Sequence, residues 1–151
     1  MYLNLKTRWN NLKLVHKYPF LYPRNVWTGK KVFTFYEYTM FDFIPKGWRK
    51  AFGLAFCEEL KEALHKLPKD ELKSFWIYDI KEKYGTLRIS CTWYTKEIDD
   101  IISKYEKLSQ TTCISCGKPA EVITRGWVSP YCKECIPNNE KYDPIKEDSN
   151  D

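Results

Sequence analysis

Two pairs of cysteines near the C-terminal end constrain this chain most. Each pair has the spacing C-x-x-C, and residues 117–131 separate the pairs: Cys113, Cys116, Cys132 and Cys135. This spacing is typical of a Zn²⁺ site in which each tight turn supplies two thiolates and the intervening segment forms a hairpin. Gly117 permits the positive φ that such a turn requires. The sequence therefore predicts one structural Zn²⁺, with two disulfides or free thiols as the alternative.

The zinc site is expected to be structural because four cysteines complete the tetrahedral coordination of Zn²⁺ and leave no open position. We therefore expect no reaction at the metal. Its role is to let a short segment fold with little apolar surface of its own. Lys118, Arg125 and Lys133 are expected to offset part of the negative charge of the thiolates.

Composition places the rest of the chain among folded, non-membrane proteins. Of its 151 residues 43% are hydrophobic and 17% aromatic, which is enough for a core. No run of about 18 apolar residues predicts a transmembrane helix, and the N-terminus lacks the apolar run of a secretory signal. Six cysteines without such a signal favour the reducing cytoplasm, with Cys57 and Cys91 as small core residues. No membrane partner is expected.

Hydrophobic periodicity predicts the elements of secondary structure. Apolar residues at intervals of three and four predict two helices, residues 48–67 and 96–108. Pro68 ends the first, and Thr95 caps the second. Runs of β-branched and aromatic residues predict strands: residues 32–38, 75–80 and 86–94. A hairpin is expected within the cysteine segment, from residues 121–124 and 127–131.

These elements predict an α+β fold in which a small antiparallel sheet is packed by two helices. Residues 1–111 are expected to form this domain, with a basic aromatic N-terminal arm over about residues 1–31. Residues 112–136 form the Cys₄ zinc module, and residues 137–151 an acidic tail. The module is zinc-ribbon-like or a treble clef, and a treble clef requires a helix that begins at Cys132–Cys135.

The N-terminal arm is the first candidate binding surface. Residues 1–36 carry seven basic residues and no acid, although the net charge of the whole chain is only +5. Aromatic residues and prolines are interleaved with these cations, which suits contact with phosphates and stacking on bases. The candidate residues in the arm are Arg24, Trp27, Lys30 and Lys31. The alternative is that the arm packs its aromatic residues against the core.

The turn between the two central strands is the second candidate. It carries cations and an aromatic residue that can meet phosphates and a base: Lys81, Lys83, Tyr84 and Arg88. The alternative is a solvated turn with Glu82 as a neutralising neighbour. Arg125 and Trp127 on the zinc hairpin are further candidates. Trp127 either stacks on a base or packs the zinc module onto the helix that ends at Leu108.

No catalytic motif supports an enzyme. The chain has no P-loop, dinucleotide-binding, nucleophile-elbow or zinc-protease motif. Its two histidines, His16 and His65, adjoin no nucleophile motif. The neighbouring acids Asp99 and Asp100 are explained by their place in the first turn of a helix.

Several sequence blocks together resemble a family of small, uncharacterised proteins of bacteriophages and prophages. The blocks are YPFLYPRNVWTG (18–29), PKGWRKAFG (45–53), DIKEKYGTLR (79–88), and TCISCGKPA (112–120) with GWVSPYC (126–132). The resemblance spans about residues 17–136 and implies a phage setting, in which small basic zinc proteins handle nucleic acid or counter host defences. In that family aromatic residues typically follow Leu87-Arg88, whereas Ile89 and Ser90 follow here, which weakens any exposed aromatic role for this strand.

Two functions follow as hypotheses, with a third disfavoured. The first is a non-catalytic, phage-type zinc protein of the host cytoplasm that binds nucleic acid or nucleoprotein. The second is a counter-defence protein that binds a host protein or its nucleotide messenger. The third, a zinc-assisted hydrolase, is disfavoured because four cysteine ligands leave no open metal position. Salt dependence separates a polynucleotide from a small nucleotide, because a polynucleotide releases many counterions.

Overall fold

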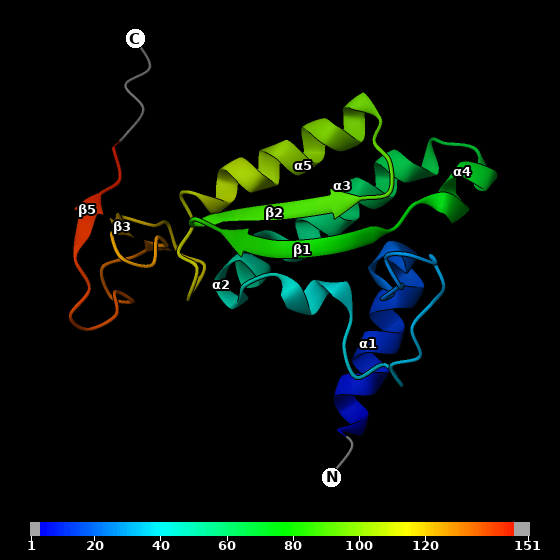
Figure 1. The fold of residues 1–151 in the computed structure, drawn as a ribbon, viewed down its shortest axis with the longest axis horizontal. Helices are drawn as coiled ribbons and strands as arrows, with labels where there is room; N and C mark the ends of the chain where they lie inside the picture. The colour runs from blue at the N-terminus through cyan, green and yellow to red at the C-terminus, as the bar shows by residue number, and fades with distance from the viewer. Residues whose placement is uncertain (1–3, 147–151) are drawn as a thin grey trace.

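The structure is a computed structural model that describes residues 4–146, and it is of the α+β class (Figure 1). Its helices are α1 (Leu5–Lys17), α2 (Lys46–Trp48), α3 (Leu54–His65), α4 (Lys69–Ser74) and α5 (Lys96–Ser109). Its strands are β1 (Ile77–Lys83), β2 (Thr86–Cys91), β3 (Val122–Thr124), β4 (Pro130–Tyr131) and β5 (Tyr142–Pro144). Short 3₁₀ segments are η1 (Pro19–Leu21) and η2 (Met40–Phe43), and η3 (Arg49–Gly53) is π-helical. Over residues 4–146 no helix combines the length and apolarity that crossing a bilayer demands.

The central unit is the antiparallel hairpin β1–β2, which α3 and α5 cover on one face (Figure 1). Alternation along β2 turns Leu87, Ile89 and Cys91 into the core, while Arg88 faces solvent. Both strands were predicted, with boundaries a few residues away from those observed. Helix α5 confirms the helix predicted over residues 96–108, and the Thr95 hydroxyl accepts a hydrogen bond from the Ile98 N–H (3.2 Å) as its cap.

The predicted helix over residues 48–67 is also confirmed, with a π-helical interruption near its start. Helical backbone runs from Lys46 to His65 through η3. At the end of η3, a Cβ on Gly53 would lie 2.9 Å from the Phe41 ring, so the glycine allows this ring to lie against the helix. Trp48, Phe56 and Leu60 point into the core and are at most 1% exposed.

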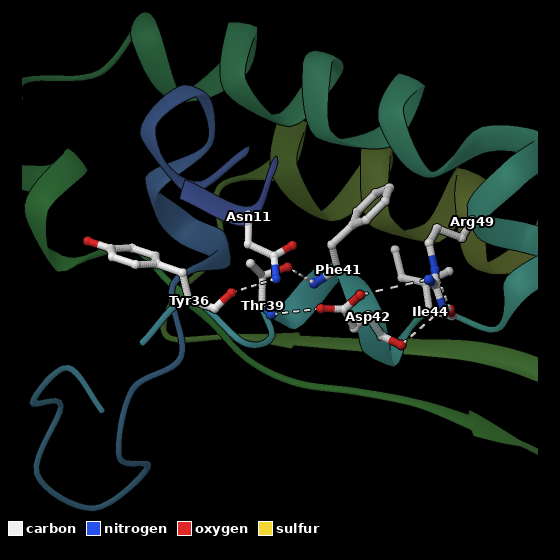
Figure 2. Close-up of polar contacts among 7 residues, drawn as sticks. All are labelled: Asn11, Tyr36, Thr39, Phe41, Asp42, Ile44 and Arg49. Carbon is white, nitrogen blue, oxygen red and sulfur yellow. Dashed lines mark hydrogen bonds and ion pairs between the residues drawn. The ribbon is translucent and has the colours of Figure 1, made fainter. Parts of the chain in front are cut away.

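The strand predicted over residues 32–38 is wrong, because Phe35 and Tyr36 adopt left-handed backbone conformations (φ 53° and 60°) that no strand accommodates. Side chains of α1 hold the carbonyls of both residues. The Arg8 guanidinium donates to Phe35 O (2.5 Å), and the Asn11 amide donates to Tyr36 O (2.8 Å, Figure 2). Residues 32–38 therefore form a loop fixed by tertiary hydrogen bonds rather than by a sheet.

Helices α1 and α4 were not predicted. The charged and polar residues of α1 leave only Asn11 and Val15 buried, so its sequence carries a weak apolar stripe. Asn4 caps α1 through a hydrogen bond from the Thr7 N–H (3.1 Å). The chain that follows packs Tyr18, Phe20 and Leu21 into the core at 4% exposure or less. This part of the arm therefore packs its aromatic residues against the core, which was the alternative to binding.

A compact set of hydrogen bonds carries the chain from this loop into η3 (Figure 2). Thr39 and Asp42 form a capping box, in which the Thr39 hydroxyl accepts from Phe41 N–H (3.2 Å) and the Asp42 carboxylate accepts from Thr39 N–H (2.8 Å). The Arg49 guanidinium then donates to the carbonyls of Ile44 (3.0 and 3.1 Å) and Asp42 (3.2 Å). Arg49 thereby ties the start of the helix to η2.

We expect Arg49→Lys to lower the free energy of unfolding by about 1–2 kcal/mol, because an ammonium cannot reproduce the forked donors that reach two carbonyls. Lys50→Ala is the matched control at an exposed neighbour and is expected to change stability by less than about 0.5 kcal/mol. Urea denaturation followed by far-UV circular dichroism measures both. Equal stability of the two variants would show that the Arg49 contacts contribute nothing.

The cysteine segment forms a second small sheet in the order β4–β3–β5. Strands β3 and β4 lie within the two segments expected for the zinc hairpin. Strand β5 falls inside the segment expected to be an acidic tail and pairs with β3, and the Arg125 guanidinium binds both Asp143 carboxylate oxygens (2.6 and 2.9 Å). Residues 132–135 form a turn, and no helix follows them up to residue 146. Residues 147–151 of the predicted tail lie outside the described residues.

Candidate metal centre and binding clefts

The four C-terminal cysteines lie at one point where two turns meet. Their sulfur atoms are all within 4.8 Å of one another, and the Sγ atoms of Cys116 and Cys132 are 3.6 Å apart. In the first turn the Gly117 N–H donates to Cys113 O (3.0 Å), with Gly117 at φ +83°. In the second turn the Cys135 N–H donates to Cys132 O (3.1 Å). Four thiols so placed are suited to hold one metal ion.

Backbone N–H groups and neighbouring charges tune these sulfurs. Burial opposes ionisation of the Cys113 thiol, but N–H groups of Cys132, Cys116 and Ser115 outweigh it and lower its pKa to about 7. Hydrogen bonds with Cys132 and Cys116 raise the pKa of Cys135 to about 12, since crowded thiols resist ionising together. A bound cation removes this repulsion, because it stabilises all four thiolates.

The cations expected to balance the sulfurs are partly engaged elsewhere. The pKa of Lys118 is raised mainly by Glu134, 3.3 Å away, and secondarily by Cys116. Arg125 pairs with Asp143 as described above, and Lys133 lies 3.6 Å from Glu121. Lys118 therefore interacts electrostatically with Cys116 of the cluster as well as with Glu134.

The first cysteine turn is joined to the start of the long helix. The Gly47 N–H donates to Ile114 O (2.8 Å), and the Trp48 indole N–H donates to Thr112 O (2.8 Å). A Cβ on Gly47 would lie 2.3 Å from Cys113 O, and one on Gly117 would lie 2.6 Å from Gly47 O. The helix start and the cysteine turn can approach this closely because neither Gly47 nor Gly117 has a Cβ. The cysteine cluster is therefore positioned by the α+β domain.

The other two cysteines confirm their predicted place in the core. Cys57 is completely buried and Cys91 is 3% exposed. Burial raises the pKa of each thiol to about 12, so both stay neutral and unreactive. None of the six cysteines, all of which lie within the described residues, forms a disulfide.

The structure brings three predicted binding residues together from two distant segments. Lys83 and Tyr84 of the β1–β2 turn and Trp127 of the zinc hairpin line one cleft of about 340 Å³ with Glu82, Gly126 and Val128. Tyr84 is 79% exposed and Trp127 is 76% exposed. Gly85 allows the two segments to meet, because its backbone is left-handed (φ 78°) and an added Cβ would lie only 3.2 Å from the Val128 carbonyl oxygen. Trp127 therefore does not pack the module onto the end of α5.

The other candidates near this turn take part in surface ion pairs. Lys81 lies 3.2 Å from Asp79, and Arg88 lies 3.6 Å from Glu106 on α5. Lys81 and Arg88 are cross-strand partners, so their charges sit side by side on the hairpin. Glu82, expected as a neutralising neighbour, instead accepts a hydrogen bond from the Gly85 N–H (2.5 Å) and shapes the turn.

The candidates of the N-terminal arm lie at the other end of the hairpin. Residues 24–31 form a closed loop, with a bridge between Arg24 and Lys31 and with Trp27, 93% exposed, at its tip. The Arg24 guanidinium lies over the Trp76 ring (4.9 Å), and the Lys31 ammonium lies over the Tyr22 ring (5.1 Å). Lys30 is exposed. Strand β1 is seven residues long, so this loop is roughly 20 Å from Tyr84.

Sequence reasoning missed a cleft between α3, α4 and the segment after α1. It has a volume of about 330 Å³, and three of its basic residues, Lys61, His65 and Lys73, were not candidates. Lys61 and His65 are four positions apart on α3, which places them on one helix face. Lys73 belongs to the unpredicted helix α4, so no pattern in the sequence linked it to α3.

Comparison of the chain with protein families, with curated proteins and with solved structures found no match in any of the three.

Proposed function

We propose that this chain is a non-catalytic, zinc-stabilised protein that binds single-stranded nucleic acid between the β1–β2 turn and the zinc hairpin. The observation that carries the proposal is the pair of exposed aromatic side chains, Tyr84 and Trp127, which line one cleft from two different elements. Successive bases stack on such side chains without regard to sequence. The resemblance to phage proteins adds support, since nucleic-acid handling is one role expected in that setting.

Tyr84 occupies a position that folding alone does not favour. Tyr84 (φ 52°) and Gly85 (φ 78°) are the central residues of the two-residue turn, and turns with positive φ at both positions prefer Asn-Gly or Asp-Gly. A tyrosine there costs of order 1 kcal/mol of backbone strain, and at 79% exposure its ring regains little by burial. Because the backbone strain at Tyr84 is not offset by packing of its ring, it supports a role for the ring in binding.

The metal's part in this function is to order the zinc hairpin, which carries Trp127 on one side of the cleft. Four thiolates that can surround one ion favour zinc, and an iron–sulfur centre is the other group that such ligands commonly bind. The site is closed by its four ligands, so it supplies shape rather than a reaction. We propose zinc because two C-x-x-C pairs at this spacing are typical of structural zinc sites.

Cations around the cleft suit the phosphate backbone. The Lys83 ammonium lies 6.0 Å from the Tyr84 ring centre, where it can meet a phosphate while a base stacks on the ring. Lys81 is held only in an exposed ion pair, which is worth little in water and can exchange for a phosphate. Arg88 pairs with Glu106, whose side chain is half-buried. Lys83 therefore lines the cleft beside Tyr84, and Lys81 and Arg88 lie farther along the same hairpin.

We expect Tyr84→Ala and Trp127→Ala each to weaken binding of a labelled single-stranded oligothymidylate by about 1–3 kcal/mol. Fluorescence anisotropy at several salt concentrations measures the affinity, and steep weakening with salt is expected because phosphates release counterions. Trp27→Ala is the matched control, since this exposed tryptophan lies at the far end of the hairpin.

Two results would contradict the proposal. If wild-type protein binds no oligonucleotide at low salt, the function is wrong. If Trp27→Ala weakens binding while Tyr84→Ala and Trp127→Ala do not, the binding surface is the N-terminal loop rather than the cleft.

A further inference from the structure

We propose a second binding site for a nucleoside monophosphate, in the cleft between α3, α4 and the segment 19–24. This site goes beyond the oligonucleotide-binding cleft, and the two lie at opposite ends of β1. Its volume of about 330 Å³ lies within the range of small-ligand sites. The side chains that line it divide into an apolar floor and a basic rim.

The floor is built from rigid, buried side chains. Phe20, Leu64 and Phe75 are each 4–5% exposed, so the edges they present to the cleft are held in place by the core. Phe20 and Phe75 meet edge to face with ring centres 6.3 Å apart, and Phe75 in turn meets Trp93 at 5.2 Å. A floor of this kind suits a flat, largely apolar ring such as a nucleobase.

The rim is basic throughout. Arg24, Lys61, His65 and Lys73 line the cleft, and no acidic side chain does. None of the ion pairs found within residues 4–146 involves these four residues, although many lysines elsewhere on the described surface have an acidic partner. The positive charges of Arg24, Lys61 and Lys73 gather around this apolar hollow, and a bound phosphate can pair with them.

Arg24 is the anchor of the rim because its position is fixed. Its guanidinium lies over the Trp76 ring, and Nη1 donates to Gly29 O (2.8 Å). Its Nε is buried and has no acceptor within the described part of the chain, so one donor of a cation is left unsatisfied. The guanidinium as a whole lines the cleft and has no ion-pair partner in the described part of the chain, so its charge can pair with a phosphate bound there. Packing against Trp76 also gives binding an optical signal, through tryptophan fluorescence.

The chemical class follows from the two parts together. The apolar floor alone fits many rings, and the basic rim alone fits inorganic phosphate. A ligand that joins a flat ring to a phosphate through a short linker satisfies both, and a nucleoside monophosphate is the simplest such molecule. We therefore expect inorganic phosphate and the nucleoside that corresponds to the best-bound nucleotide each to bind at least about tenfold more weakly than that nucleotide, because each loses one half of the contacts.

The test measures binding of AMP, GMP, CMP and UMP to the full chain by calorimetry and by tryptophan fluorescence. At least one of the four is expected to bind below about 1 mM, with a shallow dependence on salt because only one phosphate is involved. The double variant Lys61→Glu, Lys73→Glu is expected to weaken that binding at least about tenfold. Lys50→Glu, Lys107→Glu is the matched control, with the same charge change at exposed positions away from the cleft.

Three results would overturn the site: no binding by any of the four nucleotides, equal weakening by both double variants, or equal affinity for the best-bound nucleotide and for phosphate alone. Circular dichroism melts of both variants show whether weakening comes from loss of fold, and Arg24→Gln provides a milder change at the anchor. Tyr84→Ala is expected to leave nucleotide binding unchanged while it weakens oligonucleotide binding. Failure of either proposal therefore leaves the other intact.

Discussion

Protein prepared without chelator is expected to contain one Zn²⁺ per chain and to lose the fold of its C-terminal segment when Cys116 is replaced by serine. The reason is that the β4–β3–β5 sheet has strands of two or three residues and few buried side chains, so its own core contributes little to its stability. In small zinc modules metal affinity is folding free energy, of order 10 kcal/mol at neutral pH. Metal analysis gives the stoichiometry, and hydrogen exchange over residues 112–146 reports the fold.

The matched control for this prediction is Cys57→Ala. Cys57 is a completely buried cysteine outside the cluster, so its loss is expected to lower stability while zinc stays at one per chain. Metal analysis that finds iron instead of zinc would contradict the proposed metal. If Cys116→Ser keeps the same exchange protection as the wild type, the segment folds without its metal and the prediction is wrong.

Gly47→Ala is expected to destabilise the protein by about 3 kcal/mol and to weaken its metal binding at the same time. A Cβ at this position would lie 2.3 Å from Cys113 O and 2.5 Å from Ile114 O, and these are backbone atoms that cannot move aside. Relief of the clash has to separate the start of the long helix from the turn that carries Cys113 and Cys116. Thermal denaturation and competition with a chelator measure the two effects.

Gly126→Ala is the control for the loss of a glycine as such. Its nearest neighbour to an added Cβ is a carboxylate oxygen of Glu140 at 3.4 Å, the far end of a flexible side chain, so little change in stability is expected. If Gly47→Ala proves as mild as Gly126→Ala, the close approach of the helix and the cysteine turn does not constrain the metal centre.

Long periodic segments could be predicted from sequence, and short or irregular ones could not. The helix from Lys46 to His65, helix α5 and the two strands of the hairpin each repeat a pattern over many residues, so their period is unambiguous. Helix α1 buries little of its surface, and the loop around Phe35 and Tyr36 has the residue types of a strand. The left-handed backbone of this loop depends on hydrogen bonds from α1, which cannot be predicted from the local sequence.

The candidate sites show the same division. Tyr84, Trp127 and Lys83 were recognised one at a time as residues that can contact nucleic acid, but their meeting in one cleft requires the zinc hairpin to fold against the β1–β2 turn. The basic cleft with Lys61 and Lys73 escaped notice because it joins separate helices. A surface assembled from distant segments has no characteristic residue spacing in the sequence by which it can be recognised.

The sequence by itself determined the elements and ligands that depend on local spacing: the two cysteine pairs, the amphipathic helices and the alternating strands. These follow from the period of each backbone and from the reach of a tight turn, both of which act within a few residues. Only the tertiary structure decided where the cysteine cluster sits, through the contact of Gly47 with the first cysteine turn. It also decided which exposed aromatic and basic side chains share a cleft, because packing between distant segments sets those distances.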